Sequence, residues 1–238
     1  MPTSSVHIPP GNRLLDSLPV ADQDELASDL EAHRLELKEL LLEPGKPIEH
    51  VYFPINAVAS ILSLVDDTPG VETATVGNEG VLGLSVWWGI TSTQPKDLSQ
   101  CQVPGDALLM EADRFAYWVS QGGAFADIIH RYTQAFVSQV SQQVACNSLH
   151  TLEERAARWM LLTGDRVDSD EFPLTQEFLA QMLGARRPSV TLVEGTLQQA
   201  GFIRSRRGRI RITDRRGLEG AACECYQVLR EVFDRLLG

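Results

Sequence analysis

The sequence predicts an α+β fold in which a jelly roll of short strands is followed by one long helix and then by a small unit of helices and a hairpin. Three observations predict this order. From about residue 34 to residue 110, short apolar runs alternate with turns rich in Gly and Pro, as in all-β rolls and barrels. A stretch without Gly or Pro extends from Ala124 to Leu149. Beyond it, short helical patterns return and lead into an arginine-rich hairpin.

Composition places the chain among globular proteins with a buried core. Of its 238 residues, 43% are hydrophobic, which suits one large domain or two small ones. Its apolar runs are shorter than the ~18 residues of a membrane helix, so we expect no membrane partner. Residues 1–11 lack the basic and apolar regions of a secretory leader. We therefore expect a cytoplasmic protein with four reduced cysteines: Cys101, Cys146, Cys223 and Cys225.

Charge is divided unevenly along the chain. The net charge is −11 at pH 7, yet the segment from Arg186 to Arg216 holds nine arginines against Glu194 and Asp214. One basic patch on an acidic body is typical of a site for a polyanion. A solvated charged surface would have the same composition, so charge alone does not separate the two interpretations.

Residues 12–123 are predicted to form the first domain. Its first part, Asn12 to Ala32, has the pattern of short helical pieces, with Leu26 and Leu30 one turn apart. From Arg34 onward apolar and polar residues alternate, as in half-buried strands. The domain ends where Gly122 and Gly123 interrupt a short helix.

Residues 124–150 are predicted to form one long helix between the two domains. A stripe of residues at spacings of three and four runs along it to Cys146, apolar in its first half and polar in its second, like a heptad seam. We expect this stripe to hold a homodimer together, and an ordinary core helix packed on the roll is the alternative. The predicted dimer residues are Ile129, Tyr132, Phe136, Gln139 and Gln143.

Residues 151–238 are predicted to form a winged helix-turn-helix domain with an additional C-terminal helix. Thr175 can cap a first helix through its hydroxyl, and Pro188 is tolerated only in the first turn of a second one. Between them, Ala180 allows close packing of the helices, Gly184 allows a left-handed turn, and Val190 fills the angle. This spacing predicts a helix-turn-helix.

A small hairpin is predicted directly after the second helix. Gly201 ends that helix, Arg207 and Gly208 form a turn, and Ile210 alternates with arginines up to Ile212. Arginines on such a wing can contact phosphates along a DNA duplex. The combination of a helix-turn-helix with an arginine-rich hairpin indicates double-stranded DNA as the partner.

From Asn12 to Ile212 the sequence resembles the Crp/Fnr transcription regulators. The likeness is strongest in the run from Leu179 to Gly184 and at Val190, and it extends to the run from Pro44 to Pro54. The resemblance implies a cyclic-nucleotide-binding-like β-roll, a dimerisation helix and a winged helix-turn-helix. It also implies a homodimer that binds an interrupted palindrome, and RNA polymerase is a further partner that such regulators can have.

The resemblance places the DNA-reading residues at the start of the second helix. Arg187 can bind guanine through two hydrogen bonds, and Leu192 can contact a thymine methyl. Pro188 stands where the best-known members carry Glu, so their target sequence is not expected here. The predicted DNA-binding residues are Thr175, Arg186, Arg187, Ser189, Leu192, Arg204, Arg206, Arg207 and Arg209.

The effector-binding residues that the resemblance implies are Glu79, Gly80 and Gly83, in a turn of the roll. In nucleotide-binding members the Glu of this turn binds the ribose, and a later Arg pairs with the cyclic phosphate. No arginine lies between Gly83 and Asp113, and a phosphate without a cation loses its charge-assisted hydrogen bonds. We therefore expect no response to cyclic AMP, with Glu79 acting as a turn residue and the effector unknown.

The sequence predicts no metal ion and no cofactor. Cys101 and Cys146 are too few for an iron–sulfur sensor in the N-terminal half, and nothing marks one histidine as a haem ligand. Cys223 and Cys225, if both lie on one helix, point about 200° apart. We expect one of these two thiols to be packed and the other exposed, and a redox role is the alternative.

Two other classes of function remain open from the sequence. A jelly roll can be a small-molecule-binding protein or a cupin-like enzyme, but its five histidines lack the closely spaced pair of a cupin metal site. The sequence also lacks a nucleophile motif and a phosphate-binding loop, so no catalytic residue is predicted. An adaptor that binds another protein through its acidic surface is the third class.

Overall fold

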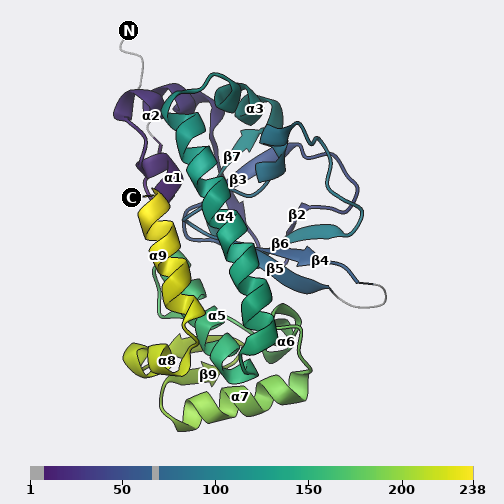
Figure 1. Cartoon of the computed structure of the whole chain (residues 1–238), viewed down its shortest axis with the longest axis vertical. Coiled ribbons are helices and arrows are strands. Elements are labelled where there is room, and N and C mark those ends of the chain that lie inside the picture. Colours follow the sequence, from purple (N-terminus) through teal and green to yellow (C-terminus); the bar gives the residue numbers. More distant parts are fainter. Residues whose placement is uncertain (1–7, 66–69, 238) are drawn as a thin grey trace.

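The computed structural model describes residues 8–65 and 70–237 (Figure 1). Most of the segment that lacks a leader pattern, residues 1–7, lies outside this range. Figure 1 shows a roll of strands on one side of a long helix, and a smaller unit at one end of that helix. Within the described residues, every helix is too short or too polar to cross a membrane.

The first domain begins with three short helical pieces, as predicted. They are α1 (Arg13–Asp16), α2 (Val20–Leu26) and the 3-10 helix η1 (Ala27–Asp29). Asn12 fixes the first of them to the roll, because its side-chain amide donates to the carbonyl oxygens of Pro54 and Gly80 at 2.8 and 3.0 Å. These short helices at the start of the first domain therefore cover one end of the roll.

Two antiparallel sheets form the roll, which confirms the predicted jelly-roll class. One sheet has the order β1 (Glu31–Leu35), β7 (Gly105–Glu111), β3 (His50–Pro54). The other has the order β2 (Leu40–Leu42), β6 (Asp97–Val103), β4 (Val58–Ser63), β5 (Val71–Val76). The 3-10 helix η2 (Leu84–Trp88) and α3 (Ala112–Ser120) close its end.

The long helix α4 (Gly123–Leu149) lies across the roll with its predicted seam facing inward. Ile129 and Tyr132 are fully buried in the core that the helix shares with the roll. The backbone of Gly80 approaches the Tyr132 ring so closely that an added Cβ would clash with the ring and its hydroxyl oxygen. Gly80 therefore serves the packing of roll against helix.

The helix α5 (Leu152–Val167) docks on α4 and the roll through buried polar groups. Arg166 pairs with Glu79 at 2.8 Å and donates to the side-chain oxygen of Gln139 at 2.7 Å. Arg158 donates to Gln143 at 2.6 Å. The polar half of the predicted seam thus accepts hydrogen bonds from arginines of the same chain.

The second unit contains a three-stranded sheet and the helices that pack on it. The strands are β8 (Glu171–Pro173), β10 (Arg209–Ile212) and β9 (Ile203–Arg206), in that order. The helices are α6 (Gln176–Met182), α7 (Arg187–Gln199) and α8 (Arg215–Ala221). Their core includes Leu179, Val190, Leu197, Ile203 and Ile210.

The last helix, α9 (Cys225–Leu237), returns along α4 to the first domain. Phe233 and Leu237 enter the core of the roll, so this helix connects both units. Cys223 precedes the helix and Cys225 begins it, and both thiols are buried. The prediction of one exposed thiol is therefore wrong, because the two residues do not lie on one helix. All four cysteines are free.

A pH dependence of stability follows from Glu72, which is buried under α5. Burial raises its pKa to about 7 from 4.5, although Ser60 and Trp159 donate hydrogen bonds to it. Because folding raises this pKa, the stabilising contribution is present below pH 4.5 and is lost as the pH rises through about 7. The loss amounts to about 3 kcal/mol for a shift of this size.

We expect Glu72→Gln to remove this loss, because the amide can still accept from Trp159 without carrying charge. Urea unfolding at pH 5 and pH 8 should show the variant gaining stability over the wild type mainly at pH 8. Glu31→Gln, at an exposed position of β1, is the control and should leave the difference between the two pH values unchanged. An equal gain for Glu72→Gln at both pH values would contradict the prediction.

Candidate nucleic-acid interface

The helices α6 and α7 have the predicted helix-turn-helix geometry. Thr175 caps α6, because its hydroxyl oxygen accepts from the backbone N–H of Phe178 at 3.2 Å. Gly184 has a φ of +58°, the left-handed conformation that favours glycine. Ala180 and Val190 are buried between the two helices. The residues that predicted the motif therefore hold the two helices together.

The exposed start of α7 presents the predicted base-reading residues. Arg186 is the N-cap and Pro188 lies in the first turn, as the sequence predicts for this proline. Three of the predicted residues here are exposed: Arg187, Ser189 and Leu192. Leu192 is an apolar side chain, yet 74% of its surface is accessible to solvent. The first turns of α7 thus expose a guanidinium group, which can donate two hydrogen bonds, together with an apolar side chain.

Thr191 belongs to the same exposed surface and was missed by the sequence analysis. Its hydroxyl oxygen lies 3.0 Å from the carbonyl oxygen of Arg187 and 2.9 Å from the side-chain oxygen of Gln176. The signal was available, because a residue four positions after Arg187 shares its helix face. Thr191 connects the exposed face of α7 to the start of α6.

The predicted wing is a β-hairpin in which a two-residue turn connects β9 to β10. Arg207 and Gly208 both have positive φ, +51° and +72°, which matches the right-handed twist of the strands. The backbone N–H of Leu174 donates to the carbonyl of Gly208 at 2.8 Å, so the wing tip is tied to the segment just before Thr175. The predicted arginines Arg204, Arg206, Arg207 and Arg209 are all exposed.

Glu171 on β8 neutralises part of this basic surface. Its carboxylate lies 2.9 Å from Arg209 Nε and also binds the guanidinium of Arg211. The pKa of Glu171 is lowered, mainly by the hydrogen bond from Arg209 and also by the one from Arg211. Arg215 is turned away from the wing and pairs with Asp165. The arginine count of the sequence therefore overstates the charge available to a polyanion.

The three predicted effector residues do not share one pocket. Glu79 is buried against Arg166, and Gly80 is covered by Tyr132. Gly83 lines a cavity between the roll and α4, together with Phe136 and other residues. The described lining of that cavity contains Asp97 as its only charged side chain. A ligand there would meet an apolar, slightly acidic wall.

The predicted dimer residues face the interior of the chain. Ile129, Tyr132, Gln139 and Gln143 are buried, and Phe136 is half-buried against the roll. The exposed stripe of α4 lies beside them on the helix and has the same spacing of three and four. It consists of Gln134, Val137, Ser141, Val144 and Ser148. A helix stripe inside the fold and one outside it cannot be told apart by periodicity alone.

Comparison with known proteins agrees with this architecture. Residues 154–221 match the family model of the Crp-like helix-turn-helix domain. FixK2 from Bradyrhizobium japonicum superimposes with a TM-score of 0.68 at 16% identity, over 82% of this chain and 98% of that one. Curated protein sequences gave no match.

Two further structures have the same fold. A Crp/Fnr-family regulator from Eubacterium rectale has a TM-score of 0.65 at 17% identity, over 87% of this chain and 96% of that one. A CRP-family regulator from Thermus thermophilus has a TM-score of 0.65 at 18% identity, over 81% of this chain and 99% of that one. The chain thus has the fold of the Crp/Fnr transcriptional regulators, with a Crp-like helix-turn-helix domain at residues 154–221.

Proposed function

We propose that the protein is a transcriptional regulator that binds an interrupted palindrome in double-stranded DNA as a homodimer, and that it does not respond to cyclic AMP. One observation carries the proposal: the start of α7 and an arginine-bearing wing are both exposed, and backbone hydrogen bonds tie the wing to the helix-turn-helix. The structures from Eubacterium rectale and Thermus thermophilus, which share this fold, are described as transcriptional regulators.

Base reading is assigned to the first turns of α7. Arg187 can donate two hydrogen bonds to the major-groove edge of guanine, and Leu192 can pack on a thymine methyl. Phosphate contacts are assigned to Ser189 and to the cap residue Thr175, which are both exposed. Arg204, Arg206 and Arg207 supply contacts that do not depend on sequence, and Arg209 contributes less because Glu171 already pairs with it.

Dimerisation is assigned to the exposed stripe of α4. Val137 and Val144 are 51% and 63% exposed and stand seven residues apart, so they form an apolar strip on the outer face of α4. Ser141 and Ser148 between and beyond them are small, so a second α4 could approach closely. A two-fold pair of α4 helices would set the two copies of α7 one helical turn of DNA apart, about 34–36 Å.

Two alanine substitutions on β9 test the wing. We expect Arg204→Ala with Arg206→Ala to weaken binding to all duplexes alike, because phosphate contacts carry no sequence information. The slope of log K against log salt should fall by about 0.9 for each lost contact, or about 1.8 in total. Gel shifts or anisotropy across a salt series measure both quantities.

The matched control removes the same charge elsewhere. Arg131→Ala with Arg235→Ala changes two exposed arginines on α4 and α9, and the salt slope should stay at the wild-type value. Weakening confined to one preferred sequence, with an unchanged slope in the wing variant, would contradict the assignment.

The dimer assignment is tested by Val137→Glu and Val144→Glu. Each change sets two like charges against one another across a two-fold contact, so we expect dimerisation to weaken at least tenfold, about 1.4 kcal/mol. Sedimentation at micromolar concentration provides the measurement. Val20→Glu, at another exposed valine, should leave the dimer intact. A wild-type protein that stays monomeric both free and on DNA would exclude the proposal.

Cyclic AMP is expected to bind no more tightly than adenosine. Adenosine is the matched control, because it keeps the base and the ribose but lacks the charged phosphate. The cavity lined by Gly83 and Asp97 offers that phosphate no cation among the described residues, and an unpaired buried anion costs several kcal/mol. Calorimetry and melting temperature should show no effect of millimolar cyclic AMP or cyclic GMP. A dissociation constant below about 10 μM for either would overturn the expectation.

A further inference from the structure

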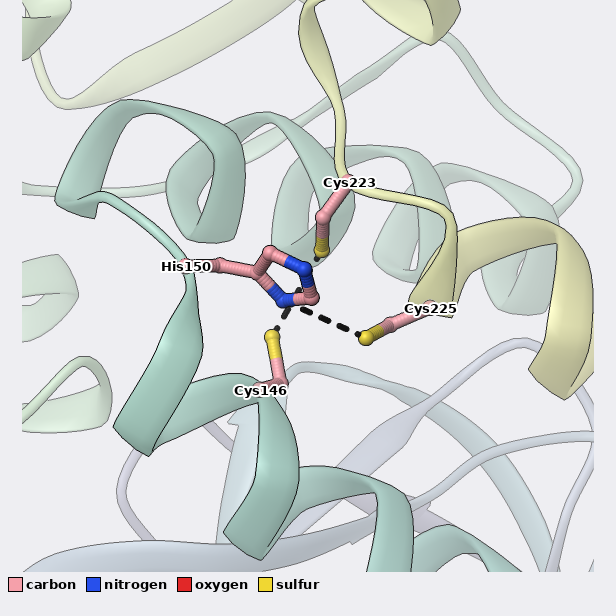
Figure 2. Close-up of side chains that lie close together, drawn as sticks. All are labelled: Cys146, His150, Cys223 and Cys225. Atoms are coloured by element: carbon pink, nitrogen blue, oxygen red, sulfur yellow. Dashed lines mark hydrogen bonds between the residues drawn. The ribbon is translucent and has the colours of Figure 1, made fainter.

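A cluster of three cysteines and one histidine lies where α4 ends and α9 begins (Figure 2). Cys146 lies in the last turn of α4 and His150 directly after it, whereas Cys223 precedes α9 and Cys225 is its first residue. Figure 2 shows the four side chains pointing toward one another. One donor atom from each side chain lies within 4.8 Å of the other three.

The distances suit a single ion in the middle of the cluster. The sulfurs of Cys146 and Cys223 are 3.5 Å apart, and the sulfur of Cys225 is 3.5 Å from Nδ1 of His150. A tetrahedral ion with Zn–S bonds of about 2.3 Å places its ligand sulfurs about 3.8 Å apart. These two separations lie within a few tenths of an ångström of that value, and every other separation in the cluster is at most 4.8 Å.

The surroundings of the cluster also resemble those of a metal centre. Nδ1 of His150 faces the sulfur of Cys225, and its other ring nitrogen, Nε2, lies 3.2 Å from the carboxylate of Glu224. Metal-binding histidines commonly donate their second ring N–H to such a group. The side-chain N–H of Gln142 donates to the sulfur of Cys225 at 3.0 Å. The charges of Arg155 and Arg158 act on Cys146 and would favour the net negative charge that three thiolates keep around a divalent ion.

We propose that Cys146, His150, Cys223 and Cys225 form a closed binding site for one thiophilic divalent ion, of which Zn²⁺ is the representative. Four protein ligands leave no position for substrate, so the ion would be structural or regulatory rather than catalytic. An iron–sulfur cluster fits less well, because its own iron and sulfide atoms must lie between the ligands. The buried sulfurs form a small cluster apart from the main cores.

Such an ion would control the joint between the long helix and the second unit. His150 is extended, with φ −103° and ψ 150°, and it separates α4 from α5. The ion would hold this joint to the first residues of α9. We therefore expect metal loading to slow amide hydrogen exchange in residues 146–152 and 223–227.

The test is metal binding by the reduced full-length chain after removal of metal with a chelator. We expect one Co²⁺ per chain, with the intense visible bands of a tetrahedral thiolate site, and displacement of Co²⁺ by Zn²⁺. Zn²⁺ should protect three of the four thiols from alkylation. Weak, non-stoichiometric Co²⁺ binding without thiolate bands would overturn the proposal. So would a Cys146–Cys223 disulfide that persists in excess Zn²⁺, or reconstitution of an iron–sulfur cluster at these four residues.

Variants separate the site from general effects on folding. Cys146→Ser should abolish tetrahedral Co²⁺ binding, whereas Cys101→Ser changes the one cysteine outside the cluster and should bind like the wild type. Glu224 is exposed and is not a ligand, so Glu224→Gln should fold normally and bind Zn²⁺ 10–100-fold more weakly, roughly the loss known for such partners. Glu231→Gln, at an exposed position of α9, is its control. Equal Zn²⁺ affinity of Glu224→Gln and the wild type would contradict the assigned role of the carboxylate.

Discussion

The buried pair of Glu79 and Arg166 is the constraint on which the arrangement of the two units depends. Both side chains are almost fully buried, and the guanidinium also binds Gln139 and Thr75. It thus joins a turn of the roll, the middle of α4 and the far end of α5. Loss of one partner from such a pair leaves a buried charge, which costs about 3–5 kcal/mol. The position of α5 on the roll is therefore specified chemically as well as by shape.

This pair also explains why the sequence predicted the C-terminal unit better than the long helix. The helix-turn-helix depends on contacts between Ala180, Gly184 and Val190, which lie close together in the sequence, so their spacing carries the geometry. The function of Gln139 depends on Arg166, and the ion pair of Glu79 spans 87 residues. The sequence shows this glutamine only as a member of the polar half of a stripe along the long helix. It cannot show whether the partner is a second copy of the helix or another segment of the same chain.

The candidate DNA surface shows the same limit. The sequence located the wing arginines, because alternation and a turn are local signals, and all four predicted residues are exposed. The partial neutralisation of Arg209 depends on Glu171, which lies on a strand that adjoins the wing only after folding. The distribution of charge along the sequence therefore predicts the location of a polyanion site. It is a poorer guide to the affinity of that site, because pairing in the fold removes part of the charge.

The inward face of α4 now has a physical explanation along its whole length. Its apolar first half packs on the roll, its glutamines accept hydrogen bonds from the arginines of α5, and its last member, Cys146, meets the thiols at the start of α9. Three different segments thus contact one helix face in succession. The helix α9 also enters the core of the roll through Phe233, so it contacts the roll as well as α4. The helices α4 and α5 are therefore fixed at two places: far from their joint by the buried ion pair and its hydrogen bond to Gln139, and at the joint by the contacts of Cys146 and His150 with the segment that begins α9.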